Sequence, residues 1–398
     1  MTDFSRRQFL KYSGASALAS LAATMTNVDI AQAATTTPPL PVGTPILVIV
    51  TLYGGNDGLN TVVPYLDPVY TAKRPGLSLT PAEVLPLTNG LALNATMTGF
   101  QSLWNEQKLA IVLGTSYPQP NYSHFSSMAI WQTASPADQI TTGWIGRWLD
   151  AQPHDPFTAI GIGDVLVPLM AGVKSAGSVL PIYGLEIPYG SLGQQAQFLG
   201  NHSRLDTRVT ALAAGAVNDL YEVSSVVQPA MKTPPPSTAS DLGQQLDTVA
   251  NLITANVPTR VYSVTTDGFD THADELSAQS ALVGDVSTSV SNFLTQIGTT
   301  PRANDVIVMV YSEFGRRVEA NGSQGTDHGT AAPVFVAGNR VVGGFYGEQP
   351  SLTQLVDGDL AVTTDFRDVY ACMLADVLGA DPQRFIPGWS TKLNLISA

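Results

Sequence analysis

The hydrophobic positions of the chain fall into short apolar runs that alternate with amphipathic stretches. Five strand-length runs, most of them rich in valine and isoleucine, span residues 46–52, 109–113, 260–264, 305–311 and 333–337. Runs that are apolar throughout are typical of strands buried on both faces of a parallel sheet. Apolar residues spaced three and four apart predict helices at 123–132, 205–221, 242–255, 275–297 and 366–378. This alternation predicts an α/β fold with a doubly wound, mostly parallel sheet and helices on both faces.

The first 33 residues have the pattern of an export signal. Arg6 and Arg7 precede an apolar stretch at 12–25 that is too short to span a bilayer, and Ala31 and Ala33 are the small residues that a signal peptidase recognises. The paired arginines resemble the twin-arginine signal. We therefore expect the twin-arginine translocase to carry the chain to the periplasm or the cell exterior, with cleavage after Ala33.

The rest of the chain reads as one large domain. Residues 34–45 resemble an extended spacer, and 46–398 form a single α/β domain in which the proline-rich stretch near 224–240 is an irregular surface connection. No stretch after the signal is long and apolar enough to be a transmembrane helix, so we expect no transmembrane segment in the mature chain.

Charge and cysteine content narrow the classes of partner. The formal net charge is −13, which argues against nucleic acid and anionic lipid because both are bound through basic surfaces. An acidic chain suits cation binding instead. The single cysteine, Cys372, cannot form an intramolecular disulfide, so stability must come from packing or from bound metal.

Polar side chains flank the predicted strands, at the edge where an open α/β sheet binds its ligands. They are Asn56 and Asp57 after the first run, Ser123 and His124 after the second, Asp270 and His272 after the third, Glu313 and Arg316 after the fourth, and Asp327 and His328 before the fifth. Carboxylates and imidazoles that converge from separate loops are what a two-metal hydrolytic site requires. A serine among them is a competent nucleophile if a metal lowers the pKa of its hydroxyl.

Each of these residues also has an ordinary structural explanation. Asp57 lies in a glycine-flanked turn, Ser123 can be a helix N-cap, and Arg316 with Arg317 can be a solvated basic pair. Three familiar site motifs are missing from the sequence: the Gly-x-Ser-x-Gly elbow, the P-loop and the Gly-x-Gly-x-x-Gly turn. The sequence therefore gives no support to an esterase elbow or to nucleotide-cofactor chemistry.

Seven segments, in their order along the chain, resemble the bacterial family labelled domain of unknown function fifteen-oh-one, whose members are typically exported by the twin-arginine route. They are residues 54–60, 123–125, 143–147, 268–272, 312–316, 325–329 and 364–367. More remotely, the family is similar to the alkaline phosphatase and sulfatase superfamily. That resemblance implies an alkaline phosphatase-like fold and attack on a phosphate or sulfate ester by a metal-bound nucleophile.

The resemblance also implies roles for single residues. Ser123 matches the nucleophile, with His124 beside it as a second catalytic residue, and Asn56 and Arg316 are the implied substrate-binding residues. The implied metal ligands are Asp57, Asp270, His272, Glu313, Asp327 and His328, for divalent zinc, calcium or manganese. The chain departs from the superfamily at Glu313-Phe314, where an Asp-His pair is usual, so one imidazole ligand is lost unless Asp327 or His124 replaces it. It also has Tyr122 where the nearer family has an arginine.

These observations favour an exported, metal-dependent hydrolase of phosphate or sulfate esters on a small molecule or a polysaccharide. A non-catalytic relative that binds surface polysaccharide or assists cell-envelope assembly is the alternative. A third hypothesis is a serine esterase that pairs Ser123 with His272 or His328.

Overall fold

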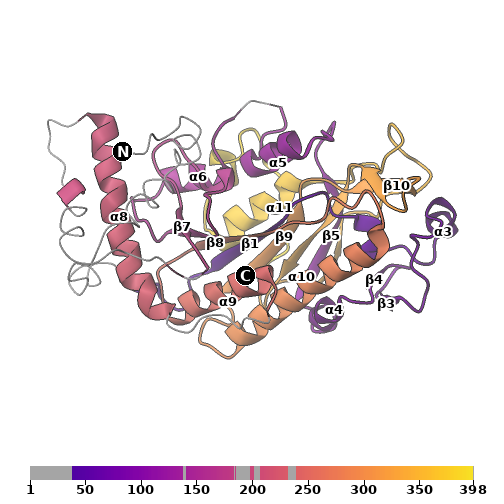
Figure 1. The fold of residues 1–398 in the computed structure, drawn as a ribbon, viewed down its shortest axis with the longest axis horizontal. Helices are drawn as coiled ribbons and strands as arrows, with labels where there is room; N and C mark the ends of the chain where they lie inside the picture. Colours follow the sequence, from indigo (N-terminus) through magenta and orange to yellow (C-terminus); the bar gives the residue numbers. More distant parts are fainter. Residues whose placement is uncertain are drawn as a thin grey trace, which may run out of the picture.

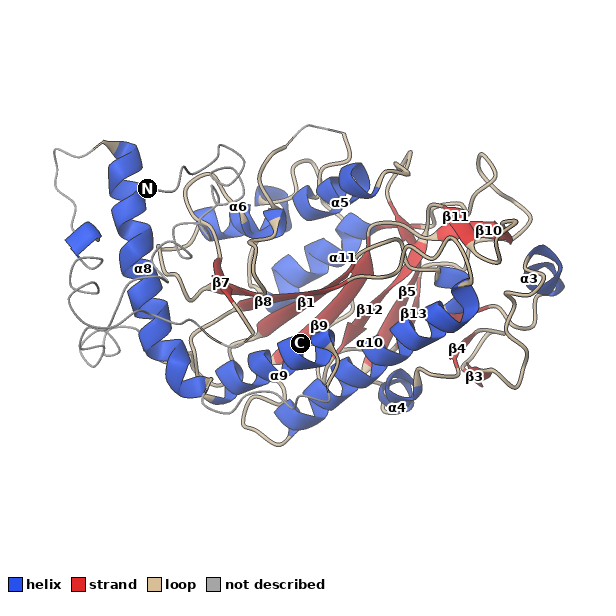
Figure 2. Ribbon diagram, in the orientation of Figure 1, coloured by secondary structure: helices blue, strands red, loops and turns tan. Residues whose placement is uncertain are grey.

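The fold is organised around one nine-stranded sheet (Figures 1 and 2). The computed structural model describes residues 38–137, 140–182, 184, 198–200, 207–231 and 239–397. The strand order is β13-β5-β12-β9-β1-β8-β6-β7, and β14 adds to β5. Every pairing among these strands is parallel except the two pairings of β12, with β5 and with β9. The predicted doubly wound, mostly parallel α/β class is confirmed.

The strands of the main sheet are short except at its centre. Their bounds are β1 Ile46–Leu52, β5 Leu109–Ser116, β6 Ala159–Ile162, β7 Ser178–Leu180, β8 Val261–Thr266, β9 Val306–Ser312, β12 Ala332–Ala337, β13 Gly344–Tyr346 and β14 Thr364–Asp365. Two small sheets are formed by β2 Val62–Val63, β3 Val84–Pro86 and β4 Ala92–Asn94, and by the hairpin β10 Arg316–Ala320 and β11 Thr326–His328. All five apolar runs predicted as strands are confirmed, whereas the shorter strands were not predicted.

Helices cover both faces of the main sheet (Figure 2). Their bounds are α3 Pro68–Lys73, α4 Thr98–Asn105, α5 His124–Thr133, α6 Trp144–Asp150, α8 Arg208–Ala230, α9 Asp241–Thr254, α10 Glu275–Gly298 and α11 Phe366–Cys372, which continues as a π-helix, Met373–Val377. Val48 and Val50 of β1 face the core beneath α4, α9 and α10. Leu47 and Ile49, which point the opposite way because side chains alternate along a strand, face α5, α6 and α11.

Two segments differ from the predictions. Helix α8 extends to Ala230, so helix occupies the start of the stretch at 224–240 that was predicted to be irregular. Its buried valines, Val223 and Val227, keep the helix packed on the core, and Pro229 lies in its last turn. Residues 232–238 lie outside the described residues.

The other difference is the direction of β12, which we expected to be parallel. Strand β9 ends at the carboxyl edge of the sheet, and the β10–β11 hairpin stays at that edge. Only residues 329–331 separate β11 from β12, which is too short for a crossover to the opposite edge. Strand β12 therefore starts at the carboxyl edge and runs antiparallel to its neighbours.

The predicted signal at 1–33 and the first part of the predicted spacer lie outside the described residues. Residues 38–45 carry no helix or strand, although Arg302 donates to the Pro41 carbonyl and Asp305 accepts from the Gly43 N–H. Within the described part of the chain, no helix has the length and apolar character needed to cross a membrane.

Candidate functional site

Three segments bring imidazole and carboxylate groups together beyond the carboxyl ends of the central strands. His124 begins α5, Asp270 and His272 lie in the loop between β8 and α10, and His328 ends β11. We call these four residues the His/Asp cluster. The ligand atoms that His124, Asp270 and His328 can offer all lie within 4.8 Å of one another. The fold thus brings together, at the ends of different strands, residues that are up to 204 positions apart in the sequence.

Asp270 contacts all three histidines of the cluster. Its Oδ1 lies 3.0 Å from His272 Nε2, 3.2 Å from His328 Nε2 and 3.4 Å from His124 Nε2. His272 Nε2 and His328 Nε2 are themselves 3.0 Å apart. Three Nε2 atoms therefore point at one carboxylate oxygen and at one another.

The other ring nitrogen of each histidine contacts an acceptor. His124 Nδ1 lies 2.8 Å from Glu313 Oε1, His328 Nδ1 lies 2.7 Å from the Tyr122 carbonyl, and His272 Nδ1 lies 3.5 Å from Asp327 Oδ1. A carboxylate or carbonyl can only accept, so in the first two pairs Nδ1 donates. The neutral ring then carries its lone pair on Nε2, which is the arrangement that orients metal-binding histidines.

This arrangement leaves the cluster short of hydrogen-bond donors. The buried Nε2 of His124 makes no hydrogen bond within the described residues. Lone pairs on His328 Nε2 and on Asp270 face each other at 3.2 Å, which is unfavourable unless a proton or a cation lies between them. The donor set of imidazole nitrogens and one carboxylate oxygen fits a divalent transition metal or zinc ion.

Electrostatics keep the cluster ready to bind a cation at neutral pH. Burial alone would raise the pKa of Asp270, but the hydrogen bond and the positive charge of Arg316 act against burial and hold that pKa below its ordinary value. Burial lowers the pKa of His328 below its ordinary value. Asp270 is therefore ionised and His328 is neutral, which are the forms that bind metal.

Glu313 contacts the cluster through His124, on the side of the ring that faces away from Asp270. It follows β9 directly and is fully buried. Its Oε1 accepts from the Gly54 N–H at 2.9 Å as well as contacting His124, and its Oε2 accepts from Ser312 Oγ at 3.0 Å. Glu313 and Asp327 were both predicted as metal ligands. In the structure Glu313 contacts Nδ1 of His124, the ring nitrogen that faces away from Asp270, and Asp327 contacts Nδ1 of His272.

Arg316 has no free face for a substrate. It is 1% exposed, and its guanidinium donates to Asp270 and to four backbone carbonyls, those of Gly54, Gly55, Phe269 and Thr326. These carbonyls belong to the loops after β1 and β8 and to β11. Arg316 therefore holds together the loops that carry the cluster, which is a positioning role and differs from the predicted contact with substrate.

Asp57 and Asn56 are buried away from the cluster. The Asp57 carboxylate pairs with the buried Arg74 and accepts from the Leu59 N–H. Asn56 Oδ1 accepts from Thr61 and Gln279. Asp57 thus lies in an internal ion pair and Asn56 in an internal hydrogen-bond network. The structure does not bring either side chain to the His/Asp cluster.

A second carboxyl group, that of Glu275, lies beside the Asp57–Arg74 pair. Burial and the nearby charge of Asp57 raise the pKa of Glu275 to about 9, and Thr326 donates to its Oε2 at 2.6 Å. For Asp57, burial acts in the opposite direction to Arg74, and the arginine prevails, so the Asp57 pKa is lowered. At neutral pH the proton resides on Glu275 and the negative charge on Asp57.

Ser123 lies between two residues that contact the cluster, Tyr122 through its carbonyl and His124 through its ring. Ser123 is the exposed N-cap residue of α5, but its hydroxyl does not cap the helix. Its N–H donates to Asn121 Oδ1 at 2.8 Å. The N-cap position predicted from the sequence is confirmed, and the hydroxyl remains available for chemistry.

Sequence reasoning missed several residues of the site. The carbonyl of Tyr122 orients His328, and Arg74 neutralises Asp57. No pattern in the sequence distinguishes a backbone carbonyl that accepts from a histidine, and Arg74 lies in a segment with no predicted strand. For His124, by contrast, the signal was its place after a predicted strand.

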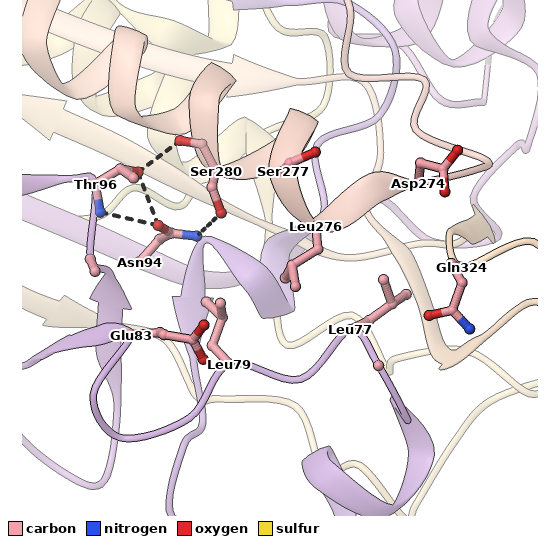
Figure 3. A pocket seen from close by; sticks show the side chains of 12 residues that line it. Leu77, Leu79, Glu83, Asn94, Thr96, Asp274, Leu276, Ser277, Ser280 and Gln324 are labelled. Atoms are coloured by element: carbon pink, nitrogen blue, oxygen red, sulfur yellow. Dashed lines mark hydrogen bonds between the residues drawn. The ribbon is translucent and has the colours of Figure 1, made fainter.

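A pocket of about 530 Å³ is lined by residues of the loop after α3, by residues near β4 and by the start of α10 (Figure 3). Asp274 and Gln324 form one wall, where Asp274 N donates to the Ser323 carbonyl and Glu275 N donates to the Gln324 carbonyl. Leu77, Leu79 and Leu276 supply apolar lining, with Ser277 and Glu83 among the polar residues. The pocket therefore has a mixed polar and apolar lining, and none of the four cluster residues is part of that lining.

Replacing Glu313 with glutamine is expected to weaken zinc binding by about 10- to 100-fold, because the amide is a poorer acceptor for His124 Nδ1–H and lowers the basicity of the ring. Titration of the purified variant with zinc against a competing chelator measures the change. Glu319→Gln, at an exposed position paired with Lys73 on the surface, is the matched control. Equal zinc affinity in both variants would contradict this role for Glu313.

Comparisons with known proteins give structural and family relationships. A protein of the alkaline phosphatase superfamily from Vibrio parahaemolyticus is 10% identical, with a TM-score of 0.37 over 84% of this chain and 70% of that chain. Murine ectonucleotide pyrophosphatase/phosphodiesterase 5 is 10% identical, with a TM-score of 0.41 over 85% of this chain and 96% of that chain. A sulfatase from Pseudoalteromonas is 11% identical, with a TM-score of 0.36 over 85% and 68% of the two chains.

The comparison with curated proteins gave no match. A family model, in contrast, matches the part of the chain that contains Asp270, His272, Glu313 and His328. The predicted family is confirmed there: residues 204–391 match the family described as a protein of unknown function, DUF1501.

Proposed function

We propose that the protein is a metal-dependent ester hydrolase whose divalent ion is held by His124, Asp270, His272 and His328. The observation that carries this proposal is the orientation of the histidines. Acceptors behind the rings of His124 and His328 direct both Nε2 lone pairs toward Asp270. A purely structural cluster would instead pair each Nε2 with a donor.

Zinc is the ion that this donor set favours. Three imidazole nitrogens and one carboxylate oxygen form a typical zinc environment, whereas calcium needs six or more oxygen ligands and manganese prefers oxygen-rich sites. Asp57, which would have added oxygen ligands, is committed to Arg74. We therefore propose that Glu313 and Asp327 contact the histidine ligands without binding the ion, and that Asp57 is not a ligand.

Ser123 is the proposed nucleophile. A divalent cation in the cluster would supply a Lewis acid that stabilises negative charge on the ester and on the serine oxygen. Ser123 Oγ forms a bond to the central atom of the ester, the bond from that atom to the alcohol oxygen breaks, and the alcohol leaves with the serine proton. Water then releases the acid and restores Ser123. The N-terminus of α5 adds favourable electrostatics for negative charge that develops there.

Ser123→Ala is expected to lower chelator-sensitive ester turnover by about a thousand-fold or more, since it removes the atom that forms the covalent bond. Zinc content should stay unchanged, because Ser123 is not among the proposed ligands. The control is Ser126→Ala, which changes an exposed serine in the same turn of α5. Initial rates and bound zinc per chain are measured on both variants.

Zinc binding without any turnover in the unmodified chain would overturn the hydrolase proposal and favour the non-catalytic alternative. Turnover that Ser123→Ala leaves intact would overturn the role of the serine alone. If the N-terminal pattern is an export signal as predicted, the hydrolase acts in the periplasm or outside the cell.

A further inference from the structure

The charges around the His/Asp cluster are balanced before any substrate binds. The carboxylates of Asp270, Glu313 and Asp327 all contact a ring nitrogen of the cluster. Arg316 is the cation in direct contact with it. A divalent ion and Arg316 together supply three positive charges, which the three carboxylates cancel. The site with its ion is therefore close to neutral and has no surplus positive charge for an anionic substrate.

The neighbouring arginines do not change this balance. Arg74 is buried and paired with Asp57, and the half-exposed Arg317 faces the buried Asp359 at 3.5 Å. Asp359 also accepts from the Tyr122 hydroxyl at 2.6 Å. A phosphate or sulfate group would meet carboxylates and carbonyls here without the bidentate arginine contacts that usually hold such groups.

An exposed aromatic residue follows the cluster residue His124 in the chain. Phe125, next to His124 in the first turn of α5, is 89% exposed. The ring of Tyr122, on the other side of Ser123, is also partly exposed. In the sequence, aromatic residues thus lie one position before and two positions after the proposed nucleophile, and an exposed aromatic ring favours contact with an apolar group.

We infer that the substrate is an uncharged carboxylic ester whose apolar part packs against Phe125. This inference rests on the proposed hydrolase function and narrows it to one chemical class. Ser123 Oγ adds to the carbonyl carbon, the carbon–oxygen bond to the alcohol breaks, and the alcohol takes the serine proton. Water then cleaves the acyl–serine bond, so that one carboxylic acid is released and the hydroxyl is restored. No charged group enters the site until the acid product forms.

The test compares esters that share one leaving group. The full-length, zinc-loaded protein is assayed with para-nitrophenyl butyrate, para-nitrophenyl phosphate, bis-para-nitrophenyl phosphate and para-nitrophenyl sulfate. Only turnover that a chelator removes and zinc restores is counted. We expect kcat/KM for the butyrate to exceed that for the phosphate and sulfate monoesters by more than about 100-fold, since a neutral site gives an anion no surplus positive charge in return for the hydration that it loses.

A binding measurement that does not depend on turnover accompanies the assay. Calorimetric titration of the zinc-loaded protein with inorganic phosphate is expected to show no saturable binding at millimolar concentration. Saturable phosphate binding, or a kcat/KM for any of the phosphate or sulfate esters that equals or exceeds that for the butyrate, would overturn the inference and leave the hydrolase proposal standing. Absence of chelator-sensitive turnover with all four esters would overturn both.

Phe125→Ala tests the apolar contact. It is expected to raise KM for the butyrate by about 10-fold, with kcat and bound zinc nearly unchanged, because it removes contact area and leaves the reacting groups in place. The matched control is Phe198→Ala, which removes a phenylalanine that is 72% exposed. Phe198 lies beside Gly200, whose carbonyl accepts from Asn218 of α8, a helix remote from β10 and α5 in Figure 1. An equal change of KM in the two variants would contradict this role for Phe125.

Discussion

Replacing Asp270 with alanine is expected to reduce the affinity of the chain for zinc by more than about 100-fold, a larger loss than removal of an outer contact causes. Asp270 is the only carboxylate whose oxygen lies within 3.4 Å of three imidazole Nε2 atoms among the described residues. Without it, the remaining ligands are neutral nitrogens next to the positive charge of Arg316. Coulomb repulsion between the ion and this arginine is then no longer offset.

The fold should survive this substitution. The Asp270 side chain is half exposed, so its ion pairs are partly screened by solvent. Arg316 keeps its hydrogen bonds to the carbonyls of Gly54, Gly55, Phe269 and Thr326. Arg316 is buried and loses its carboxylate partner, so the zinc-free variant is expected to unfold at a lower temperature than the zinc-free parent while remaining folded.

Asp267→Ala is the matched control for this prediction, because Asp267 is an exposed aspartate in the same loop. Competition with a chelator measures zinc affinity in both variants, and elemental analysis measures zinc retained per chain. Asp270→Ala should lose the tightly held ion and Asp267→Ala should keep it. Undiminished affinity in Asp270→Ala would show that the ion, if one binds, is held elsewhere.

The members of the His/Asp cluster could be predicted from the sequence because they follow or precede apolar runs. A parallel sheet places the carboxyl ends of its strands at one edge, so the position of a residue after a strand also gives its position in space. His124, Asp270 and His272 were found in this way. The hairpin that carries His328 was not predicted, and His328 lies at this edge because the strand that follows it, β12, is antiparallel to its neighbours and starts there.

The same rule failed for Asp57 because it gives the edge of the sheet and not the direction of a side chain. The turn after β1 directs the Asp57 carboxylate inward, where the Leu59 N–H and Arg74 hold it. Arg316 also follows a strand, but its guanidinium is directed into the protein and not toward a ligand. Whether a strand-end residue faces the ligand or the interior depends on partners elsewhere in the chain. Arg74, for example, lies 17 residues after Asp57.

Changing Asp57 to asparagine is expected to lower the free energy of unfolding by about 3 to 5 kcal/mol, the loss typical of a buried ion pair deprived of one charge. Arg74 is fully buried, and Asp57 holds its guanidinium through two hydrogen bonds. Asparagine keeps the size of the side chain but not its charge. The positive charge of Arg74 would then be buried with uncharged acceptors, which are the carbonyls of Arg317 and Val318 and the amide oxygen at position 57. Urea unfolding followed by tryptophan fluorescence measures the change.

Glu275→Gln is the matched control, since it makes the same change from carboxyl to amide in a buried residue beside the same arginine. Because burial raises the pKa of Glu275 to about 9, this side chain is already neutral at neutral pH, and its replacement should cost less than about 1 kcal/mol. A pKa that is raised in the folded state stabilises the protein at low pH, and this stabilisation is lost as the pH rises from about 4.5 toward about 9. The parent should therefore lose stability over this interval relative to Glu275→Gln, which cannot titrate there. Equal destabilisation by the two substitutions at neutral pH would mean that the negative charge is shared between the two carboxyl groups and does not reside on Asp57.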